Sequence, residues 1–228
     1  MGAAVELRPF LLVGVIVAAA VNPPALAQID EQVARCLGPH DALPANLRIE
    51  GCTWAIQSGR WSGRDLAFAY HNRGNAHFEN KEHDSAIADF SEAIRLDPAF
   101  APSYNNRGFT YRVARDYDRA ISDYGEAIRL DPKYALAYYN RGGAYRIKGD
   151  YERAIADYDE AIRLDPNYAL ACYDRGLAHL ARKSYDQAIA DFSKAIELKP
   201  DFAEARVNRE RAYERKKDEG GASGPTRQ

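Results

Sequence analysis

The chain has few of the residues from which metal and catalytic sites are built. It contains 3 cysteines and 5 histidines in 228 residues, and neither set has the spacing of metal ligands. No Gly-rich phosphate loop, Ser-His-Asp arrangement or HExxH-like motif is present. Acidic residues are numerous, but they recur at fixed offsets, as structural residues do. We therefore expect no catalytic activity, no metal and no cofactor.

An excess of charge of one sign is also missing. The 31 Lys and Arg residues oppose 33 Asp and Glu residues, for a net charge of -2 at pH 7, and the two signs are interspersed. Partners such as nucleic acid or an anionic membrane select for a basic excess, so neither is expected. Strict alternation of apolar and polar residues is absent too, which excludes half-buried strands.

What the chain does have is a repeat with a period of 34 residues in four copies. An Arg-Gly pair, an alanine, an aromatic residue, a second alanine and a proline recur in register. The prolines are Pro98, Pro132, Pro166 and Pro200, and the glycines are Gly74, Gly108, Gly142 and Gly176. A fixed period of this size is typical of a supersecondary unit stacked on copies of itself.

Each copy is predicted to be a pair of helices. Both halves are rich in Ala, Arg, Glu and Leu, with apolar residues at i, i+3, i+4 and i+7, which is helical periodicity. Asp116, Asp150 and Ser184 stand where a side-chain oxygen can cap the second helix, and the proline closing each copy ends it. Small Gly and Ala residues let the two helices approach, and the aromatic residue fills the space beside them.

In the third copy the recurring positions hold Tyr138, Gly142, Tyr145, Ala154, Tyr158, Ala161 and Pro166. This pattern resembles the tetratricopeptide repeat (TPR), here in an exported protein of bacterial type, and the resemblance covers residues 67–202. It implies an all-α fold, a right-handed α-solenoid of helix-turn-helix hairpins at 67–100, 101–134, 135–168 and 169–202. Arginine replaces the family's usual leucine before the glycine in every copy, and Cys172, His77 and His179 take positions that aromatic residues hold elsewhere.

The arginine before each glycine precedes an aspartate by 16 residues in every copy. A guanidinium presents paired donors that fit a carboxylate. We therefore predict structural ion pairs across each hairpin or its neighbour, in preference to a ligand site. The pairs are Arg73–Asp89, Arg107–Asp123, Arg141–Asp157 and Arg175–Asp191.

The segments flanking the repeats have their own signatures. Residues 1–27 have the layout of a secretory signal peptide, with a small-x-small cleavage site after Ala27. We expect export to the periplasm or beyond the cell, with an uncleaved membrane anchor as the alternative. In that oxidising setting Cys36 and Cys52 are expected to form a disulfide within an N-terminal helical cap at 28–66, while Cys172 is expected to be buried and inert. We expect a polar capping helix at 203–217 and a disordered tail at 218–228.

The resemblance also implies a concave groove lined by the first helix of each hairpin. The residues expected to face it are Asn72, Asn75, Asn105, Asn106, Arg112, Tyr139, Asn140, Arg146, Tyr173 and Asp174. The asparagine amides can both donate to and accept from an extended peptide; equally, they can hydrogen-bond along the stack. We expect an adaptor that binds a peptide segment or helix of another protein, with a self-assembling component of the cell envelope as the alternative.

One family subtype is not expected. The carboxylate clamp of chaperone-binding members needs two cationic residues in the third of three consecutive copies. Here those positions fall on Leu136 and Asn140, or on Leu170 and Asp174. Neither register supplies a cation, so a receptor for chaperone tails is not predicted.

Overall fold

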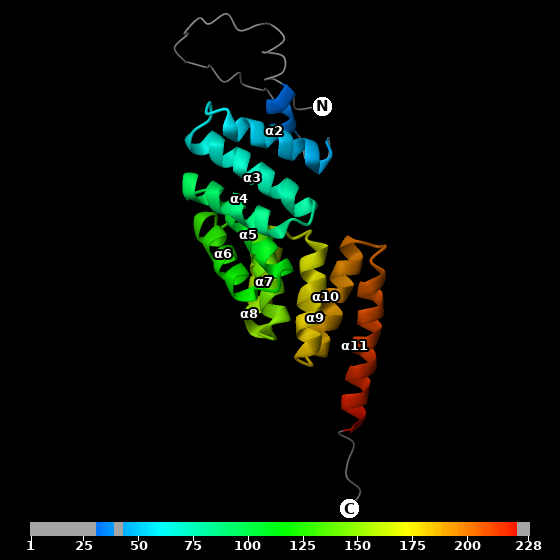
Figure 1. Ribbon diagram of the computed structural model, residues 1–228. Coiled ribbons are helices and arrows are strands. Elements are labelled where there is room, and N and C mark those ends of the chain that lie inside the picture. The colour runs from blue at the N-terminus through cyan, green and yellow to red at the C-terminus, as the bar shows by residue number, and fades with distance from the viewer. Residues whose placement is uncertain (1–30, 39–42, 223–228) are drawn as a thin grey trace, which may run out of the picture.

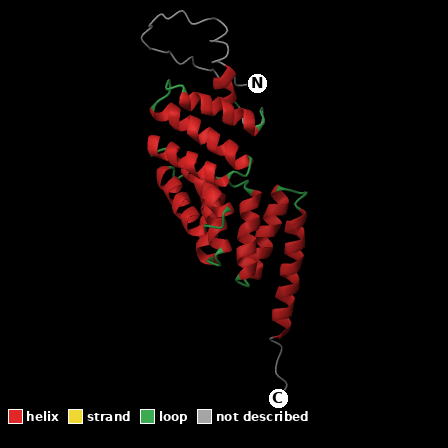
Figure 2. Cartoon of the chain, viewed as in Figure 1, coloured by secondary structure: helices red, strands yellow, loops and turns green. Residues whose placement is uncertain are grey.

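The computed structural model describes residues 31–38 and 43–222, and within them all regular secondary structure is helical (Figure 2). The expected signal segment at 1–27, with its cleavage site, lies outside the described residues. None of the described helices combines the length and the apolar content that a membrane span needs.

The helices form consecutive antiparallel hairpins, which stack in chain order from α2 to α11 (Figure 1). A short helix at 31–37 precedes α2 (Ala45–Gln57). The hairpins are α3 (Gly63–Glu79) with α4 (His83–Leu96), α5 (Ala101–Val113) with α6 (Tyr117–Leu130), α7 (Ala135–Ile147) with α8 (Tyr151–Leu164), and α9 (Ala169–Ala181) with α10 (Tyr185–Leu198), followed by α11 (Ala203–Ala222). The chain is a right-handed α-solenoid.

The curvature of the stack places the first helices on its inner side. Neighbouring first helices contact one another in the series α3, α5, α7, α9 and α11. Among the described residues, the second helices α4, α6, α8 and α10 make no such contacts with each other. Since the first helices are the closer set, they form the concave surface, which we call the inner face.

Each hairpin closes over a glycine that faces an aromatic ring. A Cβ atom added to Gly74, Gly108, Gly142 or Gly176 would lie only 2.8–3.0 Å from the ring of Phe90, Tyr124, Tyr158 or Phe192, respectively. Real Cβ contacts are longer, so the close approach of the two helices requires glycine. All four rings are buried, and they supply the main packing within each hairpin.

The predicted helix ends are largely confirmed. Each second helix ends two residues before its proline. The side chains of Asp116 and Asp150 accept hydrogen bonds from the backbone N–H groups of Arg119 and Arg153. The prediction for Ser184 is wrong, because its side chain makes no capping bond. In the two capped helices an arginine three residues on also holds the carboxylate, whereas that place after Ser184 holds Gln187.

The N-terminal cap contains the Cys36–Cys52 disulfide, which joins the helix at 31–37 to α2. Both cysteines are buried and pack with Ala55 and Ala69. Because Ala69 belongs to α3, this cluster seals the first hairpin as well as the cap.

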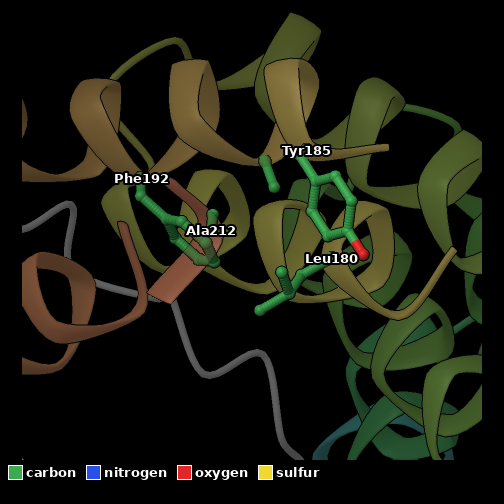
Figure 3. Close-up of a cluster of buried hydrophobic side chains, with 5 residues drawn as sticks. Leu180, Tyr185, Phe192 and Ala212 are labelled. Carbon is green, nitrogen blue, oxygen red and sulfur yellow. The ribbon is translucent and has the colours of Figure 1, made fainter. Parts of the chain in front are cut away.

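The C-terminal helix is longer than the sequence predicts. α11 continues to Ala222, so the expectation of a tail is wrong for residues 218–222, while residues 223–228 lie outside the described part. Glu219 explains the extension: it accepts a hydrogen bond from the Tyr185 hydroxyl at 3.0 Å and pairs with Lys183 at 3.2 Å. About two turns earlier, Ala212 packs with Leu180, Tyr185 and Phe192 (Figure 3).

Candidate functional site on the inner face

The four Arg–Asp pairs lie within their hairpins. In each, the arginine Nε and Nη2 donate to the two carboxylate oxygens at 2.5–3.0 Å. The four aspartates are buried. The hydrogen bond to the aspartate raises the pKa of Arg73, Arg107 and Arg141. The Nε and Nη2 donors of these arginines are occupied, so they are structural residues.

The same arginines also connect neighbouring repeats through Nη1. Arg107 donates to Ser91 at 3.0 Å, and Arg175 donates to Asp159 at 2.5 Å. Arg73 donates to a threonine of α2 at 3.2 Å. The equivalent neighbour of Arg141 is Gly125, which has no side chain to receive the bond. The arginine that replaces the family's leucine therefore ties each hairpin to itself, and it also ties two of the four hairpins to the preceding hairpin and the first hairpin to α2.

The asparagines form a network along the stack. Asn140 donates to Asn105 at 3.0 Å, Asn105 donates to Asn106 at 3.0 Å, and Asn106 donates to Asn75 at 2.8 Å. Asn72 donates instead to the backbone carbonyl of Cys36 at 3.0 Å. Asn72, Asn105 and Asn140 are buried, which corrects the expectation that Asn72 and Asn105 face a ligand, while Asn75 and Asn106 remain half-buried.

The network continues through tyrosines in the later repeats. The Tyr139 hydroxyl donates to Asp174 at 2.9 Å, and Asn208 donates to the Tyr173 hydroxyl at 2.9 Å. Burial, followed by the charge of Asp174, raises the pKa of Tyr139. Asn208 lies one period after Asp174, so the repeat itself could have identified it as a member of this set.

Two clefts open on the inner face next to this network. One, of about 50 Å³, is lined by Arg112, Tyr139, Asn140, Gly143, Arg146 and Asp174; we call it the arginine pocket. The other, of about 170 Å³, is lined by Asn75, Phe78, Phe90, Asn106 and Phe109; we call it the aromatic pocket. The structure therefore groups five of the predicted groove residues around the arginine pocket and two around the aromatic pocket; of the other three, Tyr173 lies in neither and is half-buried.

The two pockets are joined by one side chain. The guanidinium of Arg112 lies 4.6 Å from the ring centroid of Phe109, and Phe109 packs edge-on against Phe78 at 5.4 Å. Arg146 pairs with Asp174 at 3.3 Å. The inner face thus places cationic groups directly beside aromatic surface.

The edge of the inner face carries exposed apolar side chains at one repeated position. Phe68, Leu136 and Leu170 have 41–45% of their surface exposed. This is the position at which a carboxylate clamp needs a cation, so the chain offers apolar surface there instead. These residues were absent from the predicted groove set, although the repeat places them in register.

Fold and surface together define a helical-repeat protein with a polar and aromatic inner face. Family models for the tetratricopeptide repeat match residues 67–100, 107–169 and 169–202. The chain therefore belongs to the tetratricopeptide repeat family.

Solved structures show the same fold. A tetratricopeptide repeat protein from Parabacteroides merdae superposes with a TM-score of 0.70 at 17% identity, covering 86% of this chain and 76% of that one. YrrB, a TPR protein described as having an unusual peptide-binding site, superposes with a TM-score of 0.63 at 24% identity, covering 74% of this chain and 85% of YrrB. The first TPR of Spaghetti (RPAP3), bound to the HSP90 peptide SRMEEVD, superposes with a TM-score of 0.50 at 27% identity, covering 50% of this chain and 90% of that one. Among curated proteins no match was found.

Proposed function

We propose that this protein is an interaction adaptor whose inner face binds a peptide segment or a helix of another protein. The observation that carries the proposal is the arginine pocket beside the aromatic pocket, where polar and aromatic groups lie open on a surface held rigid by the buried asparagine network. Such a surface combines shape with a few fixed polar groups, as peptide sites do.

Two similar proteins support this proposal. YrrB is described as having a peptide-binding site, and the first TPR of Spaghetti was solved with an HSP90 peptide. The ligand of the latter does not transfer to this chain, because Leu136 and Leu170 stand where the chaperone clamp needs cations. A different peptide class is therefore proposed for this chain.

We also propose that the adaptor works outside the cytoplasm. The layout of residues 1–27 favours export, and the buried Cys36–Cys52 disulfide suits an oxidising compartment. N-terminal sequencing of the protein recovered from cells tests this, with Gln28 expected as the first residue. A chain that retains residues 1–27 in the membrane fraction would support the anchor alternative instead.

Site-specific photocrosslinking tests the interaction surface. A photoreactive amino acid at Leu136 or Leu170 lies on the edge of the inner face, and the same group at exposed Ser122 or Ala156 lies on the second helices as a control. We expect adducts with another protein from the two inner positions only. Adducts confined to Ser122 and Ala156, or adducts only with further copies of this chain, would overturn the proposal, and the latter would support self-assembly.

A further inference from the structure

The two central repeats differ from the outer two at a matched pair of positions. Arg112 and Arg146 occupy the first-helix position that Phe78 and Leu180 hold in repeats 1 and 4. On the facing second helix, the same two repeats hold a tyrosine where the outer repeats hold a phenylalanine: Tyr124 and Tyr158 against Phe90 and Phe192. Arginine and hydroxyl thus occur together or not at all.

The two hydroxyls lie beneath the inner face. Tyr124 and Tyr158 are fully buried, and apart from the neighbouring guanidiniums of Arg112 and Arg146 neither hydroxyl has a polar partner among the described residues. A Cβ atom on Gly143, which lines the arginine pocket, would lie 3.9 Å from the Tyr158 hydroxyl. Burial raises the pKa of both tyrosines, and the guanidiniums of Arg112 and Arg146 offset part of that rise. Each phenol is thus a neutral polar group beside a guanidinium.

The arginines of the pocket are less completely bonded than the structural arginines. The Nε atoms of Arg112 and Arg146 are buried and have no partner in the described part of the chain. Among the described residues, Arg146 has a single carboxylate neighbour, Asp174, at 3.3 Å, and none lies within ion-pair distance of Arg112. Two guanidiniums and one carboxylate leave a surplus of one positive charge. Buried donors without acceptors are costly, so a site of this composition favours a monoanion.

We propose that the arginine pocket binds a carboxylate of the partner segment between Arg112 and Arg146, and that Asp174 is an internal competitor for it. This inference rests on the proposed function and names the ligand class. The adjoining aromatic pocket, linked through Phe109, takes an apolar side chain of the same segment. The ligand is therefore a peptide with an acidic group next to an apolar residue, and the acidic group is a side chain or the peptide's C-terminus.

Selection from a random peptide library displayed on phage tests the proposal with the full-length protein. The selected peptides are synthesised with a fluorescent label. In each, the acidic residue is kept or replaced by Asn or Gln, and the C-terminus is left as a free carboxylate or amidated. These arms separate a side-chain carboxylate from a terminal one. Affinities are measured for the wild type and for Arg112→Leu/Arg146→Leu, which introduces the residue that repeat 4 holds as Leu180. Arg129→Leu/Arg163→Leu, on exposed surfaces of second helices, removes the same charge as a control.

We expect the selected peptides to share one carboxylate, and its removal or the pocket variant to weaken binding at least about tenfold, as for a charge-assisted hydrogen bond. Asp174→Asn, which restores the residue held by the equivalent positions in repeats 1 to 3, should tighten binding about threefold. This variant keeps the test decisive if the double variant fails to fold. Peptides that bind without a shared carboxylate, or equal affinity for pocket and control variants, would overturn the inference and leave the adaptor function standing. Failure to select any peptide would overturn both.

Discussion

The side-chain amide of Asn140 donates to the side-chain oxygen of Asn105 at 3.0 Å, across the boundary between two repeats. Both residues are buried. The bond is therefore made and kept in the free protein, and breaking it to bind a peptide would expose two buried amides to the cost of desolvation without compensation. These buried asparagines therefore fix how neighbouring repeats align, and the peptide is bound by the side chains of the two pockets beside them.

Asn140→Ala should lower the free energy of unfolding by about 1–3 kcal/mol, because it leaves the buried Asn105 oxygen without its donor. Urea unfolding followed by circular dichroism measures the change. A cycle with Asn105→Ala isolates the pairwise part. If the two substitutions simply add, the hydrogen bond does not couple the repeats and the structural role assigned to Asn140 is wrong.

Gly125→Ser should stabilise the protein. Gly125 is inside α6, and a Cβ there would lie 3.8 Å from Nη1 of Arg141. Ser91 holds the equivalent position one repeat earlier, where its hydroxyl accepts a hydrogen bond from Nη1 of Arg107 at 3.0 Å. Helix propensity alone ranks alanine above serine by about 0.5 kcal/mol. Because the serine hydroxyl gains a hydrogen bond from Arg141, Gly125→Ser should have a higher free energy of unfolding than Gly125→Ala. If the alanine variant is instead the more stable of the two, as helix propensity alone predicts, Arg141 does not donate a hydrogen bond to the new hydroxyl.

Arg115→Gly should raise the free energy of unfolding by about 1 kcal/mol. Arg115 joins the two helices of repeat 2 with φ at 63°, in the left-handed region, while repeat 3 has Gly149 at the same place with φ at 81°. Glycine adopts this region without the steric cost of a Cβ. Thermal unfolding of Arg115→Gly and of the reverse variant Gly149→Arg should shift in opposite directions; shifts of the same sign would contradict the explanation.

His179 should make stability fall as the pH drops below neutrality. Burial lowers the pKa of His179 below its ordinary value of 6.5. The unfolded chain therefore takes up the proton first, so this contribution is complete above pH 6.5 and is lost as the pH falls through the lower folded-state value. His179→Tyr, the residue found at Tyr111 and Tyr145, removes it. Unfolding midpoints compared from pH 7.5 to 4.5 should decline less steeply for the variant, and parallel curves would exclude the effect.

The sequence predicts the hairpins and the Arg–Asp pairs because both depend on contacts within one repeat. Arg107 and Asp123 face each other as soon as their two helices form, and four copies report the same spacing. The helix ends follow for the same reason, apart from Ser184.

The binding surface is harder to predict because it depends on how repeats meet. Asn72 and Asn140 share one position in the frame, yet the first bonds to the Cys36 carbonyl and the second to Asn105. Asp174, at that same position, is shared between Tyr139 and Arg146. The neighbouring repeat decides which of these side chains is bonded within the protein and which is accessible to a ligand. The sequence of one repeat does not show how its neighbour contacts it. The extension of α11 depends likewise on Glu219 reaching back to Tyr185.

The most direct test measures binding and stability together in Asn105→Ala, a buried member of the network that lines neither pocket, and in Arg112→Leu/Arg146→Leu. The labelled library peptides serve as probes at a temperature where both variants are folded. We expect the arginine variant to lose affinity at an unchanged melting temperature, whereas the asparagine variant should melt at a lower temperature and bind as the wild type does. Loss of peptide affinity in Asn105→Ala, with full affinity in the arginine variant, would show that the amides bind the partner and that the arginine pocket does not.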